Sequence, residues 1–193
     1  MIPSTSDIKT IQNQSEKSES PISSSIDDVK EFQTWVEIGS TQYPCSLLQD
    51  SKFGENCKMY EPFYCYGATF GNNVMVGPFV EIQRGAEIGS NTRIQSHTLV
   101  CSNVTIGKNC FIGHGVMFIN DKFPDDQPNW AKDKFKDTVI ENSVTIGSNA
   151  TILPVRIVAN TVIGAGAVVT KDILEPGVYV GNPARKLRDV KSS

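Results

Sequence analysis

Large apolar residues recur at every sixth position along the middle of the chain, from Phe70 to Phe118. Nine successive positions follow this rule: Phe70, Val76, Ile82, Ile88, Ile94, Val100, Ile106, Ile112 and Phe118. Since 39% of all residues are apolar, chance would produce such a run with odds on the order of 1 in 5,000. A period of six matches neither a helix nor a flat strand. It predicts a chain that turns a corner every six residues and lays one short strand on each face of a three-sided prism.

A second set of positions, four residues after the first, carries small or β-branched side chains. The set comprises Val74, Val80, Ala86, Thr92, Thr98, Val104, Cys110 and Val116. Both sets would point inward, and glycines after several of the large residues would ease the corners. A sandwich of short strands would instead alternate with period two and turn every 8–12 residues. The pattern therefore predicts an all-β chain, built as a parallel β-helix of the hexapeptide type.

The same register continues in both directions. Upstream it includes Phe53, Met59 and Cys65, and downstream it includes Ile140, Ile146, Ile152, Ile157, Ile163 and Val169. One residue is missing before Phe70 and another between Ile152 and Ile157. We predict eighteen hexads in six coils over residues 53–170, roughly 30 Å tall at ~4.8 Å per layer. Residues 1–27 are predicted to be a disordered polar tail, 28–52 a lead-in that caps the first coil, and 171–193 a C-terminal extension forming a short tail or helix.

One long interruption breaks the repeat, because 22 positions separate Phe118 from Ile140 where one hexad would use six. We predict a protruding loop at about 119–138. It carries Phe123, Trp130 and Phe135, and a loop exposed only to solvent would rarely contain three aromatic residues. Long loops in compact folds are usually functional, and this one could reach a neighbouring subunit.

Composition excludes several classes of function. The net charge of −3 and pI near 5.4 provide no basic surface for nucleic acid. No apolar run approaches 18 residues, so we expect no membrane span, and without a secretory signal pattern we expect a cytoplasmic protein. Five cysteines, an odd number, argue against a disulfide framework. Cys57 and Cys110 occupy the small interior position and are predicted to be small hydrophobic residues.

The only two histidines of the chain, His97 and His114, lie 17 residues apart, one short of a full coil. They are therefore predicted to project outward from nearly the same corner on adjacent coils, close to the loop. Either they belong to an active site or they are ordinary exposed histidines. A zinc site of three histidines is excluded by the count, and we expect no metal.

Several stretches resemble the bacterial hexapeptide acyltransferases, whose fold is a left-handed parallel β-helix. The C-terminal stretches that carry this resemblance are IGAGAVVTKD at 163–172 and VGNPAR at 180–185. Two further stretches, IQSHT at 94–98 and FIGHGVMFINDKFP at 111–124, resemble a narrower group. That group comprises the N-acetyltransferases of nucleotide-linked 3-amino sugars that serve surface polysaccharide synthesis. The resemblance covers about residues 45–188. It implies a homotrimer that binds acetyl-CoA in clefts between subunits and transfers the acyl group directly to a sugar amine.

The resemblance also implies roles for individual residues. His97 matches a polar residue near the reacting amine, and Asn120 and Asp121 match the loop base that faces the sugar, so these three are our candidate catalytic residues. Substrate binding is assigned to His114, Lys122 and Phe123. The coenzyme A cleft would be lined by Gly164, Ala165, Val169, Lys171, Pro183 and Arg185.

The chemistry is consistent with this assignment. A sugar ammonium must lose a proton before it attacks a thioester, and a neutral histidine suits that task. If His97 contributes little, the departing thiolate could accept the proton instead. Two other functions stay open: O-acetylation of a sugar or small hydroxyl compound on the same scaffold, and a catalytically silent scaffold subunit.

Overall fold

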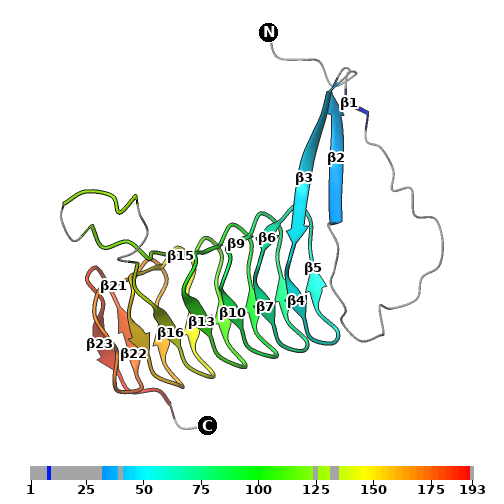
Figure 1. Cartoon of the computed structure of the whole chain (residues 1–193). Helices are drawn as coiled ribbons and strands as arrows, with labels where there is room; N and C mark the ends of the chain where they lie inside the picture. Colours follow the sequence, from blue (N-terminus) through cyan, green and yellow to red (C-terminus); the bar gives the residue numbers. More distant parts are fainter. Residues whose placement is uncertain (1–7, 10–31, 39–40, 124–125, 131–134, 192–193) are drawn as a thin grey trace.

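The computed structural model of this 193-residue chain describes residues 8–9, 32–38, 41–123, 126–130 and 135–191, with side chains from Leu48 onward in those ranges. The described residues form strands and turns, and they include no helix. Short strands wind into a prism with three faces, each a mainly parallel sheet (Figure 1). The fold is the left-handed parallel β-helix predicted from the repeat.

Each coil contributes one strand to each of three sheets. Sheet B contains β4 (Lys52–Phe53), β7 (Thr69–Phe70), β10 (Glu87–Ile88), β13 (Val104–Ile106), β16 (Thr138–Ile140) and β19 (Arg156–Ile157). Sheet C contains β5 (Lys58–Met59), β8 (Met75–Val76), β11 (Arg93–Ile94), β14 (Phe111–Ile112), β17 (Thr145–Ile146) and β20 (Val162–Ile163). Sheet A contains β6 (Tyr64–Tyr66), β9 (Glu81–Ile82), β12 (Leu99–Val100), β15 (Met117–Phe118), β18 (Thr151–Ile152) and β21 (Val168–Val169). These strands make six complete coils, and we name the corners BC, CA and AB after the sheets that they join.

The strand register confirms the hexad pattern. Residues of the large set pair directly with their counterparts one coil away, as in the series Val76, Ile94, Ile112 and Ile146. All four side chains are completely buried, and burying a side chain of this size stabilises the fold by ~1.5–3 kcal/mol. The small set is also buried, from Val74 to Val116. The interior is therefore a stack of identical layers, which is why the period of six predicts the fold so directly.

All three irregularities of the repeat lie at the AB corner, between sheet A and sheet B. Both missing residues lie there, before Phe70 and before Ile157, and so does the loop between β15 and β16. The register resumes immediately after the loop, where Ile140 pairs with Ile106. The AB corner thus changes length without disturbing the stacked core, and the loop leaves the prism near its C-terminal end (Figure 1).

Additional strands extend the prism at both ends. β2 (Phe32–Ile38) and β3 (Thr41–Gln49) form an antiparallel hairpin, β3 pairs in parallel with β6, and β1 (Ile8–Lys9) pairs with β2. The rest of the predicted tail at 1–27 lies outside the described residues. The side chains of the hairpin before Leu48 are not described either, so its capping role stays a prediction.

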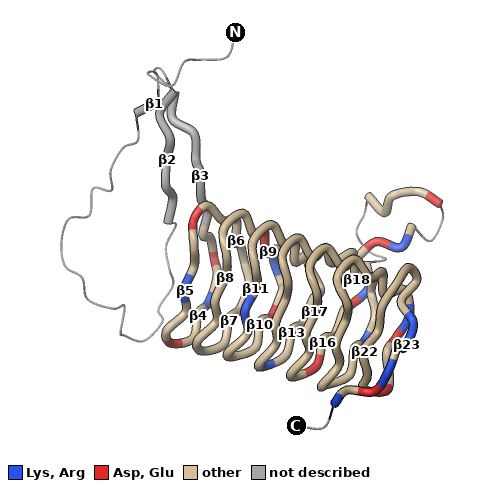
Figure 2. Tube along the Cα trace, turned by 180° about the vertical axis from the view of Figure 1, so that it is seen from behind, with Lys and Arg blue, Asp and Glu red and all other residues tan. Residues whose placement is uncertain are grey.

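The expectation of a tail or helix at the C-terminus is wrong. β22 (Val178–Val180) pairs with β20 and extends sheet C, and β23 (Arg185–Arg188) pairs with it in antiparallel fashion. β23 is rich in Lys and Arg residues, which are coloured blue in Figure 2. The physical reason is that the last coil leaves unpaired backbone groups at its edge, which a hairpin satisfies and a detached helix would not.

Candidate active site

The candidate catalytic residues lie at two different corners of the prism. His97 precedes β12 at the CA corner, whereas Asn120 and Asp121 follow β15 at the AB corner. The width of sheet A, about five extended residues or on the order of 10–16 Å, separates the two groups. A single chain therefore does not bring His97 together with Asn120 and Asp121.

At the CA corner, His97 stacks on Phe79, which occupies the same corner one coil earlier. The ring centroids are 4.9 Å apart and the planes differ by 25°. Both side chains are exposed, Phe79 by 58%. Both residues have left-handed backbone conformations, with φ of 58° for Phe79 and 63° for His97. Histidine is among the residues enriched in this region, whereas a bulky residue such as phenylalanine rarely adopts it.

His114 occupies the CA corner one coil after His97, as the spacing of 17 predicts. Its side chain is exposed, and its Nδ1 lies 2.8 Å from the Ser96 hydroxyl oxygen in a hydrogen bond. The two histidines are therefore held differently: His114 through a ring nitrogen and His97 through the face of its ring.

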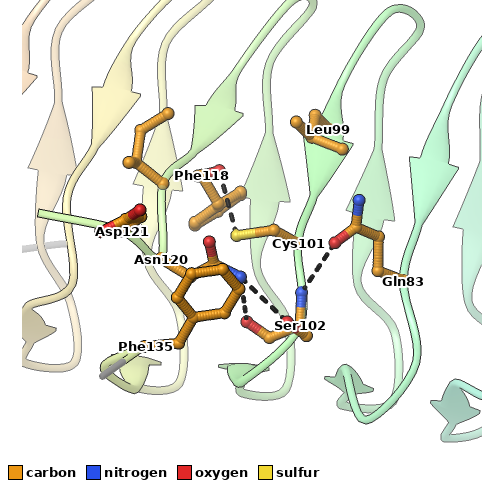
Figure 3. Close-up of a pocket in the computed structure, with 9 residues that line it drawn as sticks. Gln83, Leu99, Cys101, Ser102, Phe118, Asn120, Asp121 and Phe135 are labelled. Atoms are coloured by element: carbon orange, nitrogen blue, oxygen red, sulfur yellow. Dashed lines mark hydrogen bonds between the residues drawn. The ribbon is translucent and has the colours of Figure 1, made fainter. Parts of the chain in front are cut away.

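At the AB corner, Asn120 forms one end of a chain of hydrogen bonds that crosses three coils (Figure 3). Its amide Nδ2 donates to Ser102 Oγ over 2.9 Å and to the Ser102 carbonyl over 3.4 Å. The Ser102 backbone N–H donates to Gln83 Oε1 over 3.3 Å, and Gln83 Nε2 donates to Glu81 Oε1 over 2.9 Å. The amide nitrogen of Asn120 thus donates to Ser102. No described residue donates a hydrogen bond to the side-chain oxygen of Asn120, which is therefore available as an acceptor.

These residues border an open pocket of about 330 Å³, at the small end of the range for ligand sites. Its lining comprises Gln83, Leu99, Cys101, Ser102, Phe118, Ile119, Asn120, Asp121 and Phe135. Phe135 comes from the end of the loop, and the remaining residues come from sheet A and the corner that follows it. The pocket thus combines an apolar wall with a polar edge.

Asp121 braces the loop. Its Oδ1 accepts a hydrogen bond from the Phe123 N–H over 2.9 Å, and its Oδ2 accepts one from the Asn129 N–H over 2.7 Å. The carboxylate therefore connects the two ends of the segment 121–129. Each carboxylate oxygen can accept more than one hydrogen bond, so Asp121 could also accept a hydrogen bond from a substrate.

The predicted substrate-binding residues of the loop are exposed and lie outside the pocket lining. Lys122 is exposed and Phe123 is 52% exposed. Trp130, at 85%, is exposed further still. None of these three side chains belongs to the lining of the pocket at the AB corner.

Cys101 lies at the base of the pocket and is an unreactive thiol. It is buried, with 4% exposure, and its Sγ donates to the Phe118 carbonyl over 3.1 Å. Burial raises the pKa of the Cys101 thiol to about 11, so it is not a thiolate at neutral pH. Cys57 and Cys110 are free thiols with pKa values raised by burial, in agreement with their predicted interior positions.

The predicted coenzyme A residues are divided among several surfaces. Gly164 and Ala165 lie at the CA corner of the last coil, and Pro183 and the exposed Arg185 belong to the turn and strand that follow β22. Lys171 is exposed at the AB corner. Val169 differs from these five residues, because only 1% of its side chain is exposed and it packs in the core. Only its backbone could contribute to a coenzyme A cleft.

Sequence reasoning missed Phe79, Gln83, Cys101 and Ser102. The signal was present, since Phe79 precedes His97 by 18 residues and Ser102 precedes Asn120 by 18. In a three-sided coil, that spacing places side chains directly above one another.

The described residues contain neither a metal-binding cluster nor a membrane-spanning helix. In that part of the chain, no group of three or more His, Cys, Asp or Glu side chains is arranged to hold a metal ion. The same residues contain no helix of the length and apolarity needed to cross a membrane.

Family models match the repeat itself. Residues 67–102 match the bacterial transferase hexapeptide (six repeats), and residues 103–117 and 137–171 match the hexapeptide repeat of succinyl-transferase. The gap in the second match coincides with the loop.

Two solved structures are similar to the chain. A hexapeptide-repeat acetyltransferase from Vibrio cholerae, in complex with acetyl coenzyme A, is 26% identical, with a TM-score of 0.55 over 75% of this chain and 73% of that one. A variant of AntD, an N-acyltransferase from Bacillus cereus in complex with dTDP and coenzyme A, is 24% identical, with a TM-score of 0.59 over 74% and 85% of the two chains. At that identity the second likeness shows the fold alone.

Curated relatives include the bifunctional protein GlmU from two bacteria. The protein of Clostridium acetobutylicum is 28% identical over 84% of this chain and 37% of its own length, and that of Clostridioides difficile is 32% identical over 79% and 32%. The chain thus spans about a third of the length of these relatives.

Proposed function

Since the chain belongs to the hexapeptide-repeat acyltransferases, we propose that it transfers an acetyl group from acetyl-CoA to the amino group of a nucleotide-linked 3-amino sugar. The donor is supported by the Vibrio cholerae acetyltransferase, whose structure contains acetyl coenzyme A. The acceptor is supported by Asn120 and Asp121 at the edge of the pocket. The product would serve surface polysaccharide synthesis, as the resemblance of residues 94–98 and 111–124 implies.

The observation that carries the proposal is the fixed orientation of the Asn120 amide. Ser102 takes both hydrogen bonds of the nitrogen, so the edge of the pocket presents the Asn120 oxygen beside the Asp121 carboxylate. An amine or ammonium carries two or three N–H donors, which such a pair of acceptors suits. A hydroxyl brings only one donor, and this difference favours the amine.

Catalysis requires His97 and Asn120 in one site, which one chain does not provide. We propose that subunits of a homotrimer supply them, with the CA corner of one subunit facing the AB corner and loop of the next. The exposed loop aromatics Phe123 and Trp130 would then find partners across the interface. This arrangement would also place the coenzyme A cleft between subunits.

The reaction can be written with named groups. His97, as neutral imidazole, takes a proton from the sugar ammonium while Asn120 and Asp121 hold the remaining N–H bonds. The free amine nitrogen attacks the thioester carbonyl and forms the C–N bond, and the C–S bond breaks as the intermediate collapses. The proton that the nitrogen loses on becoming an amide passes to the departing thiolate, so coenzyme A leaves as the thiol. Base catalysis contributes typically 10²–10⁴-fold, and holding both substrates in position can contribute more.

The last coil offers a surface for the donor. Gly166, beside Ala165 at the CA corner, has a φ of 68° and open space where a Cβ would stand. A narrow pantetheine chain could therefore lie close to the backbone. Arg185 donates one hydrogen bond, to the Ala184 carbonyl, which leaves most of its guanidinium available for phosphate.

Release of thiol from acetyl-CoA, measured with a panel of acceptors, tests the proposal. The panel contains nucleotide-linked 3-amino sugars, 4-amino sugars and hydroxyl sugars without an amine. We expect turnover with 3-amino sugars and none with hydroxyl sugars. Turnover with hydroxyl sugars alone would establish the O-acetyltransferase alternative, and no turnover with any acceptor would favour a scaffold subunit.

A further inference from the structure

Two neighbouring positions of the CA corner hold bulky residues where the fold favours small ones. The left-handed position of this corner is occupied by Phe79 and His97 in the second and third coils, and by Gly115, Asn149 and Gly166 in the last three. At the BC corner the equivalent residues are Asn56, Asn73, Asn91, Asn109, Ser143 and Asn160. Glycine and asparagine adopt this conformation readily, and histidine is enriched in it, whereas phenylalanine adopts it only under strain. Phe79 is therefore the residue that departs from the pattern of this corner.

Packing does not explain the exception. Phe79 is 58% exposed and His97 is exposed as well, so neither ring fills the core. Their principal shared contact is the stack of the two rings at 4.9 Å. Strained residues that the core does not require are often found at functional sites.

We propose that Phe79 is a positioning residue, which holds the His97 imidazole in the orientation needed for proton transfer. The inference rests on the proposed function, in which His97 is the base. The His97 backbone is fixed by the hydrogen bond from its N–H to the Pro78 carbonyl, at 3.2 Å. An exposed imidazole would still rotate about its side-chain bonds, and the stack on Phe79 restricts that rotation.

The stack leaves the reactive edge of the ring free. It uses the face of the imidazole, whereas both nitrogens lie on the edge. Among the described residues, none forms a hydrogen bond to either ring nitrogen of His97. His114 differs, because the Ser96 hydroxyl occupies its Nδ1. Of the two histidines, His97 is thus the one that is oriented while both of its nitrogens stay available to a substrate.

Kinetics of the full-length protein test the proposal. Phe79→Leu, which removes the stack, is expected to lower kcat about tenfold with little change in the KM for acetyl-CoA, and Phe79→Tyr is expected to restore most of the rate. In a His97→Asn background, Phe79→Leu should have no further effect, because the two residues act together. Equal losses of rate in both backgrounds would overturn the proposal.

A glycine substitution separates positioning from folding. Phe79→Gly relieves the strained backbone, so the melting temperature should stay level or rise while kcat falls. Asn160→Gly is the matched control, since Asn160 has a φ of 58° at the BC corner and should leave kcat unchanged. If Phe79→Gly lowers the melting temperature and the rate together, Phe79 is a structural residue and the proposal is wrong.

A spectroscopic measurement distinguishes failure of this inference from failure of the proposed function. NMR of the free protein should show His97 ring protons shifted by the Phe79 ring current, with the shift lost in Phe79→Leu and kept in Phe79→Tyr. Wild-type protein that turns over no acceptor refutes the proposed function, and with it the inference. Wild-type protein that turns over amino sugars at the same rate as Phe79→Leu refutes the inference alone.

Discussion

In the second to sixth coils, the BC and CA corners each contain one left-handed residue, but the side chains at this position differ between the two corners. At the BC corner, asparagines stack: Asn73 donates to Asn91 over 3.1 Å, and Asn91 donates to Asn109 over 3.2 Å. At the CA corner the equivalent positions carry Phe79 and His97, which form no such ladder. The asparagines of the BC corner adopt the turn without strain, whereas Phe79 at the CA corner adopts it only under strain. An unfavourable residue at a repeated position is therefore a better guide to the candidate site than the repeat itself.

The largest contrast between the two corners should come from His97→Ala. We expect kcat to fall about 10²-fold, the low end of the range for loss of a catalytic base, with the melting temperature unchanged or slightly changed. Steady-state kinetics and calorimetry provide the two measurements. A near-native rate would show that proton removal does not depend on this corner.

The complementary change at the BC corner is Asn91→Ala. It removes both rungs of the ladder and places alanine at a φ of 61°, so the free energy of unfolding should fall by about 1–2 kcal/mol while kcat stays the same. Chemical denaturation measures the loss. If kcat falls as well, the BC corner contributes to catalysis, contrary to our proposal that it contributes only to stability.

The AB corner can be tested through Ser102→Ala. Without the hydroxyl, the Asn120 amide loses the partner that fixes its orientation, and we expect the KM for the amino sugar to rise about fivefold. Ser102→Thr retains the hydroxyl and serves as the matched control. An unchanged KM would mean that the amide keeps its orientation through the Ser102 carbonyl alone.

Asp121→Asn distinguishes loop bracing from contact with the substrate. The amide retains one acceptor oxygen for the two backbone N–H groups of the loop, so we expect a KM increase of about threefold and faster proteolysis within 121–129. A large fall in kcat with unchanged proteolysis would assign Asp121 to the chemistry instead.

The smallest effect concerns pH. The pKa of Cys101 is raised by burial to about 11, above its value near 8.5 in an unfolded chain. The stability that this neutral thiol contributes is fully present below about pH 8.5 and is lost as the pH rises through 11. Cys101→Ala should therefore weaken the alkaline loss of stability, measured by denaturation between pH 8 and 11. An identical pH dependence in the variant would contradict this account.

Sequence reasoning predicted the fold well because each layer of the core repeats the same two inward positions. Residues such as Ile94 and Ile112 are buried, and the position of each within its own hexad is sufficient to predict this. The site was predicted only in part. His97 was selected as one of two outward histidines and through the resemblance, and Asn120 through the resemblance alone. Their separation by sheet A depends on which corner each residue occupies.

The residues that were missed act through neighbours one coil away. Ser102 contacts Asn120, which lies one coil above it, and Phe79 stacks on His97, which also lies one coil above. Nothing in either residue's own hexad reveals this. The C-terminal hairpin was missed for a related reason, since the need to cover the last coil is a property of the completed stack.

The AB corner has a consequence for how the molecule can change. Ile106 and Ile140 pair directly although 34 positions separate them, whereas a regular coil separates paired residues by 18 positions. The strand β19, which follows a corner shortened by one residue, also pairs with β16 in the regular register. The loop at this corner joins β15 of sheet A to β16 of sheet B, and the Lys136 N–H, which donates to the Asn120 carbonyl, closes its base. We expect this segment to be replaceable without disturbing the paired strands. Loops of other lengths could be exchanged there, with different acceptor preferences, while the donor surface of the last coil and the stacked core stayed the same.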